Sequence, residues 1–157
     1  MRIGVRLGVD VGRARIGVAR CDPHAMLATP LETVPRDAKA SADIVRILAL
    51  AEEYGAVELV VGLPLGLSGH RTASTDDAED FAGRLASAGT VPVRLVDERL
   101  STTQAQGQLR EAGRKTKQSR GIIDQAAAVV ILQHAIDAER ARGEAPGELL
   151  ENPGEDA

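Results

Sequence analysis

The chain has 157 residues, of which 43% are hydrophobic, so it can bury one sizeable core without needing a second domain. Its formal net charge of −4 hides an uneven distribution. Residues 143–157 hold five acids and no Lys or Arg, which leaves 18 acidic against 19 basic residues in the rest. We therefore predict one nearly neutral domain, 1–142, able to meet nucleic acid, and an acidic, disordered C-terminal tail, 143–157.

The cysteine, apolar and aromatic content excludes several classes of protein. The single Cys21 cannot form an internal disulfide, and no cluster of Cys and His suggests zinc. The chain starts without the apolar run of a signal peptide and has no segment suited to crossing a bilayer, so we expect a cytoplasmic protein. Only Tyr54 and Phe81 are aromatic, so we expect nucleic acid to be recognised through backbone shape rather than by stacking.

The predicted elements follow from hydrophobic periodicity. Alternating residues predict a three-stranded antiparallel meander, and the later segments read as helix, strand, helix, strand and two helices. The predicted strands cover 5–12, 16–21, 26–34, 57–63 and 91–96. The predicted helices cover 38–54, 72–87, 102–111 and 122–142, the third opened by a capping box from Ser101 to Gln104. This order predicts an α/β fold in which a mixed five-stranded sheet, the meander plus two parallel strands, is flanked by helices.

Asp10 is the most unusual residue of the first strand. Strands disfavour Asp, and the flanking Gly8 and Gly12 give up packing as well. An Asp that only caps a turn would explain Gly12 but not the bare face. We interpret the glycines as positions that let another group approach the Asp10 carboxylate closely, which favours a functional role.

Two further acidic positions stand beside apolar sequence. Asp124 is the only charged residue between Arg120 and Asp137, although an acid in a first helical turn would also suit the helix dipole. Asp97 and Glu98 end a strand, where a solvated loop is the plain alternative. Since neighbouring side chains of a strand point to opposite faces, we expect only one of these two in a site.

Acids from two strand ends and a helix start suit a site for two divalent metal ions. Mg²⁺ prefers hard oxygen ligands, and two ions about 4 Å apart can activate water and stabilise the leaving oxygen of a phosphodiester. Such chemistry needs no nucleophilic side chain, and the sequence shows no pairing of Ser or Cys with His. We expect His24, His70 and His134 to be surface or packing residues.

A basic segment precedes Asp124. Five cations lie between Arg110 and Arg120, and a solvated loop is the plain alternative for such a run. Its position directly before the acid favours contact with a phosphate backbone near the predicted metals. The predicted nucleic-acid contacts are Arg13, Arg15, Arg99, Arg114, Lys115, Lys117 and Arg120.

Four motifs occur in the order of a known family. They are LGVDVGRARIGVA at 7–19, VGLPL at 61–65 followed by Gly69, DERLST at 97–102, and Asp124 with its Ala-rich continuation. Over residues 5–140 the chain resembles the YqgF/RuvX family of ribonuclease H-like proteins, described as nucleases of precursor 16S ribosomal RNA or as Holliday-junction resolvase-like proteins.

The resemblance implies a ribonuclease H-like fold and a metal-dependent nuclease, with Mg²⁺ or Mn²⁺ held by Asp10, Glu98 and Asp124. It also implies trimming of the 5′ end of precursor 16S ribosomal RNA in ribosome biogenesis. Asp97 stays the alternative to Glu98 as a catalytic residue. Compared with true junction resolvases, the strand at 57–63 lacks an interior acid and the last helix has one early Asp rather than a pair, which argues against junction resolution.

Three other functions stay open. One is a Holliday junction resolvase-like DNA endonuclease, and another is a non-catalytic RNA-binding factor of ribosome assembly whose acids are structural. The third is an ATPase of the actin-like and sugar-kinase fold, whose first phosphate loop resembles residues 10–17. Because that fold clamps its nucleotide between two domains, 157 residues would supply at most half of it. The sequence is compatible with a monomer or a homodimer.

Overall fold

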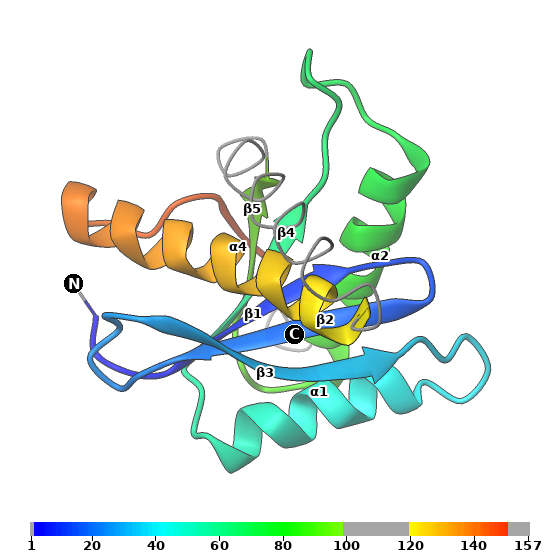
Figure 1. The fold of residues 1–157 in the computed structure, drawn as a ribbon, viewed down its shortest axis with the longest axis horizontal. Coiled ribbons are helices and arrows are strands. Elements are labelled where there is room, and N and C mark those ends of the chain that lie inside the picture. Colours follow the sequence, from blue (N-terminus) through cyan, green and yellow to red (C-terminus); the bar gives the residue numbers. More distant parts are fainter. Residues whose placement is uncertain (1, 99–119, 151–157) are drawn as a thin grey trace, which may run out of the picture.

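A computed structural model describes residues 2–98 and 120–150, apart from the side chains of 120–124. Six strands form one mixed sheet in the order β3-β2-β1-β4-β5-β6 (Figure 1). The strands are β1 (Arg6–Val11), β2 (Arg15–Cys21), β3 (Ala28–Pro35), β4 (Glu58–Leu63), β5 (Val93–Asp97) and β6 (Glu148–Leu150). The described helices are α1 (Ala42–Glu53), α2 (Ala73–Ala88) and α4 (Arg120–Arg142).

Strand β1 joins the antiparallel and the parallel halves of the sheet. It pairs antiparallel with β2, with Asp10 opposite Gly17, and parallel with β4, with Val9 opposite Val61. Strand β2 continues antiparallel to β3, and β4 pairs parallel with β5. The predicted α/β fold, with its meander and its parallel strands, is confirmed.

The sheet has six strands rather than the five predicted. Strand β6 pairs antiparallel with β5, with Leu150 opposite Val93, and it comes from the segment expected to be a disordered tail. A Cβ at Gly147 would lie 2.0 Å from the carbonyl oxygen of Leu95, and this glycine has a φ of +78°. The glycine therefore lets the chain turn closely onto the sheet edge, which an acidic composition does not reveal. For Glu148–Leu150 the expectation of disorder is wrong.

Helices cover both faces of the sheet, with α1 and α2 on one face and α4 on the other (Figure 1). Val9 of β1, Ile47 of α1 and Phe81 of α2 belong to one buried cluster. Val60 of β4 and Leu132 of α4 belong to the second. Alternation along each strand decides which cluster a side chain enters, and it also decides which acids can face α4.

Local signals account for the two shorter helices. In α1 the buried Ile44 and Ile47 follow the spacing of an amphipathic helix, and Gly55 with a φ of +61° follows its end. Thr72 and Thr75 form a reciprocal capping box that opens α2. The predicted helix at 102–111 lies outside the described residues. In residues 2–98 and 120–150, no helix is both long and apolar enough to span a membrane.

Candidate active site

Two of the predicted acids meet at one edge of the sheet. Asp10 lies near the carboxyl end of β1, and Glu98 directly follows the carboxyl end of β5. Because β1, β4 and β5 are parallel, their carboxyl ends share this edge, where α/β proteins commonly place their sites. The Glu98 side chain forms a hydrogen bond with that of Asp10. We call these two residues the acid pair.

Gly62 makes the acid pair possible, although the sequence analysis did not single it out. Strand β4 lies between β1 and β5, so Glu98 has to cross it to reach Asp10. A Cβ at Gly62 would lie 2.4 Å from Oε1 of Glu98 and 2.6 Å from Cδ1 of Ile131 in α4. Any larger residue would displace the carboxylate. The available signal was a glycine inside an otherwise apolar buried strand, which often marks a close approach.

Strand alternation directs the side chains of Asp97 and Glu98 to different sides of β5, although both residues line one pocket beside α4. Val93 and Leu95 belong to the core beneath α1 and α2, and strand alternation places Asp97 with them. Val96 belongs to the core beneath α4, the side on which Glu98 contacts Asp10. This placement supports Glu98 over Asp97 as the acid that works with Asp10.

The electrostatics of the acid pair are unfavourable for two negative charges. Burial, followed by the charge of Asp10, a hydrogen bond with Asp10 and the charge of Asp97, raises the pKa of Glu98 to about 8. Two carboxylates that share one site resist simultaneous ionisation, so the pair keeps a proton at neutral pH unless a cation offsets its charge. Among the described side chains, no group of three or more His, Cys, Asp or Glu gathers as a metal site.

The third predicted acid, Asp124, lies near the start of α4, and its side chain is outside the described set. Helix α4 runs opposite to β1, because Glu139 near the helix end bonds to Arg6 at the strand start, and Leu132 packs on Gly8 further along. The start of α4 is therefore directed toward the Asp10 end of the strand.

The two glycines beside Asp10 serve packing and turning rather than access to the carboxylate. A Cβ at Gly8 would lie 2.7 Å from Cβ of Leu132 and 2.8 Å from the carbonyl oxygen of Ala128, so this glycine lets α4 approach the sheet. A Cβ at Gly12 would lie 2.5 Å from the carbonyl oxygen of Arg15, inside the β1–β2 turn. The interpretation that both clear a path to Asp10 is wrong, because other parts of the chain fill both spaces.

The described part of the predicted nucleic-acid surface lies beyond Asp10. Arg13 is exposed in the turn between β1 and β2, and Arg15 begins β2. Arg36 braces this turn, because its guanidinium donates to the carbonyl oxygen of Gly12 at 2.9 Å and to Asp77 at 2.8 Å. The side chains of the other predicted contacts lie outside the described set; they are Arg99, Arg114, Lys115, Lys117 and Arg120.

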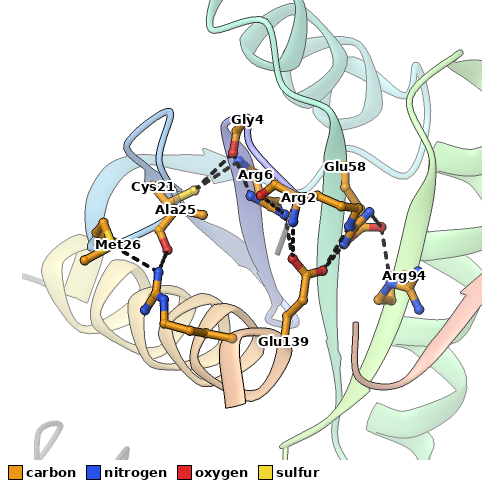
Figure 2. A network of polar contacts seen from close by, with 10 residues as sticks. Arg2, Gly4, Arg6, Cys21, Ala25, Met26, Glu58, Arg94 and Glu139 are labelled. Carbon is orange, nitrogen blue, oxygen red and sulfur yellow. Dashed lines mark hydrogen bonds and ion pairs between the residues drawn. The ribbon is translucent and has the colours of Figure 1, made fainter. Parts of the chain in front are cut away.

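A second group of buried acids lies at the opposite end of β1 (Figure 2). We call it the arginine cluster, which consists of Arg2, Arg6, Arg94, Glu58 and Glu139. Arg6 donates to Glu139 at 2.8 Å, and Arg2 bonds to both glutamates. Arg94 donates to Glu58 at 3.2 Å. Burial raises the pKa of Glu139, but hydrogen bonds from Arg2 and the charges of Arg2 and Arg6 outweigh it and lower this pKa. Because arginines compensate both acids, the cluster fastens α4 to the sheet.

Solved structures with the same architecture identify the class of fold. Thermus thermophilus RuvC in complex with a Holliday junction substrate matches with a TM-score of 0.58 and 20% identity, over 94% of this chain and 99% of that one. A second T. thermophilus RuvC structure matches with a TM-score of 0.53 over 93% of this chain and 99% of that one. The chain therefore has a ribonuclease H-like fold of the RuvC type.

Sequence comparison gives the family. The RuvX family model, described as Holliday junction resolvase, matches residues 4–138, and the chain belongs to this family. A curated relative from Clavibacter michiganensis subsp. michiganensis, named "Putative pre-16S rRNA nuclease", is 65% identical over 150 residues, which are 96% of this chain and 93% of the relative. A relative of the same name from Nocardioides sp. is 56% identical over 154 residues, with 96% and 99% covered. The predicted family is confirmed.

Proposed function

We propose that the chain is a metal-dependent nuclease that hydrolyses phosphodiester bonds of precursor 16S ribosomal RNA. The observation that carries the proposal is the acid pair, in which Asp10 and Glu98 meet over Gly62 although their charges repel. Acids held together against their own repulsion fit a cation, and carboxylate oxygens are the ligands that Mg²⁺ and Mn²⁺ prefer. The names of the curated relatives support the RNA substrate.

Asp10 and Glu98 would hold the metal together with Asp124, because the start of α4, which carries Asp124, is directed toward Asp10. When bound, the metal supplies an activated water and stabilisation of the leaving oxygen. The chain's own part is to hold two carboxylates in one orientation, with Gly62 leaving room for Glu98 and the arginine cluster fixing α4. Arg13, exposed beyond Asp10, would contact the phosphate backbone of the substrate.

Removing either carboxylate tests the proposal. Asp10→Asn and Glu98→Gln should each lower Mg²⁺-dependent cleavage of a precursor 16S ribosomal RNA fragment by about 100-fold or more while the fold survives. Asp97→Asn tests the alternative acid: because strand alternation directs this side chain away from Asp10, it should keep more activity than either of the other variants. Cleavage that persists in both Asp10→Asn and Glu98→Gln would exclude this mechanism.

A DNA junction is the second substrate to test, because the matching family model is described as Holliday junction resolvase. The same variants should be assayed on a synthetic four-way DNA junction with Mg²⁺ and with Mn²⁺. Junction cleavage with no RNA cleavage would transfer the proposal to DNA. RNA binding that is equal in wild type and Asp10→Asn, with no cleavage by either, would favour the non-catalytic assembly factor.

A further inference from the structure

A pocket of about 430 Å³ adjoins the acid pair on the α4 face of the sheet. Val96 at the end of β5 and Ile131 of α4 contribute apolar walls, and both are buried. Glu98 also lines the pocket, so the space is continuous with the proposed catalytic site. We call it the α4 pocket.

One side of α4 provides most of the remaining surface. Ala135, Ala138 and Ala141 line the pocket at helical spacing and form an apolar strip. The acids Asp97 and Asp137 also line it, and Asp137 accepts a hydrogen bond from Gln133 and pairs with Arg140. His134 lies at the end near Glu98, and Arg142 lies two turns further on, about 12 Å along the helix. Arg142 is exposed and forms no hydrogen bond or ion pair with the described residues.

The apolar strip, His134 and Arg142 together fit one nucleotide whose phosphate meets Arg142, at the far end of the pocket from Glu98. A nucleobase has two apolar faces that suit an alanine wall, and His rings and Arg planes are groups on which bases stack. Pockets of a few hundred Å³ with apolar walls and a few polar groups are typical of small-molecule sites. The Arg142 guanidinium is suited to the phosphate that a nucleotide carries.

We propose that the α4 pocket binds a single unpaired nucleotide next to the scissile phosphodiester. The proposal rests on the proposed nuclease function, and it adds a requirement for an unpaired position in the substrate. A base that is paired in a duplex cannot enter a pocket of this size, because its partner strand would remain attached to it. The α4 pocket would therefore select single-stranded precursor ends over continuous duplex.

The scarcity of aromatic residues predicted recognition through backbone shape rather than by base stacking. The proposed pocket would add contact with one base. The two aromatic side chains belong to the other side of the sheet, where Phe81 is buried in the core beneath α2 and Tyr54 packs against that core. Tyr54 further contacts Arg20, whose guanidinium lies 4.9 Å from the ring centroid. Alanines, with the ring of His134, take the place of an aromatic platform on the α4 face.

Nucleotide titration tests the pocket without requiring cleavage. Adding uridine or adenosine 5′-monophosphate to the isotope-labelled chain should shift the backbone amide signals of Ala138 and Ala141 saturably, whereas ribose 5-phosphate, which lacks a base, should not. Ala138→Leu fills the pocket and should weaken this binding about tenfold or more. Ala141→Leu, at an exposed position of the same apolar strip, is a second variant that fills the pocket. The control is Ala49→Leu, the same change on the exposed side of α1, which should bind as wild type.

Cleavage assays give the second readout. Wild type should show a raised KM for RNA in which the nucleotide beside the cut is abasic. Ala138→Leu should show the raised KM already on intact RNA and lose nothing more on abasic RNA. Amide signals that do not shift, or that shift equally with ribose 5-phosphate, would overturn the proposal, and so would equal KM values for both RNAs in wild type. If wild type cuts no nucleic acid, the proposed function fails, and the titration alone then decides whether the pocket binds nucleotides.

Discussion

The two ends of β1 carry buried acids in opposite electrostatic states. At the start of the strand, three arginines surround Glu58 and Glu139, and the pKa of Glu139 is lowered. At the other end, Glu98 meets Asp10, and its pKa is raised to about 8. The same type of side chain therefore stabilises the fold at one end and opposes it at the other. Asp10 and Glu98 repel each other, and this repulsion makes them the acids suited to hold a cation.

The largest stability effect should come from the compensated end. Glu139→Gln leaves Arg6, which is almost fully buried, without its charged partner, and breaking a buried pair in this way costs about 3–5 kcal/mol. Urea unfolding at pH 7 measures the loss. Asp137→Asn is the control on the same helix, since that side chain is 56% exposed, and it should change stability by less than about 0.5 kcal/mol. Equal losses in the two variants would show that the arginine cluster does not fasten α4.

At the acid pair, removing an acid should raise the free energy of unfolding rather than lower it. Without a divalent cation, the folded chain keeps the Glu98 proton up to about pH 8, whereas the unfolded chain releases it near 4.5. Between these values the unfolded state binds fewer protons, so this group makes stability fall as pH rises. Glu98→Gln removes the effect and should be more stable than wild type by about 4 kcal/mol at pH 8, with little difference at pH 4.

Unfolding of wild type and Glu98→Gln in EDTA across this pH range provides the measurement. Adding Mg²⁺ at pH 8 should then stabilise wild type and have little effect on Glu98→Gln, because a ligand stabilises only the state that binds it. Asp97→Asn should show the same fall in stability with pH, slightly weakened, because the charge of Asp97 is the smallest of the causes that raise the Glu98 pKa. If wild type and Glu98→Gln show parallel pH curves, the two ends of β1 do not differ as described.

A smaller change in stability tests how α4 packs along β1 between its two ends. Gly8→Ala forces a Cβ to within 2.7 Å of Leu132 and 2.8 Å of the Ala128 carbonyl oxygen, and such overpacking should cost about 1–2 kcal/mol. Gly83→Ala in α2 is the matched control, because a Cβ there meets nothing within 4 Å, and it should stabilise the chain by about 0.5–1 kcal/mol. Thermal unfolding of both variants checks the signs. A Gly8→Ala protein as stable as Gly83→Ala would mean that α4 does not rest on β1.

Periodicity predicted most of the fold because each strand and helix buries a continuous face. Alternation in β1 and the apolar run of β4 are visible in a short window of sequence, and they gave the antiparallel meander and the parallel core. Strand β6 was missed because its three residues lie among acids, and its pairing with β5 depends on Gly147 turning against a distant carbonyl. Edge strands of this length carry too little pattern to be recognised locally.

Composition and local pattern are enough to show which residues are chemically out of place: an acid in a buried strand, acids at a strand end and an acid in an apolar helix. Tertiary structure decided which of them meet: Glu98 reaches Asp10 because three strands are parallel and Gly62 leaves room between them. The tertiary structure also determines that α4, rather than a substrate, packs against Gly8. These outcomes depend on contacts between residues far apart in the chain, so no local pattern records them.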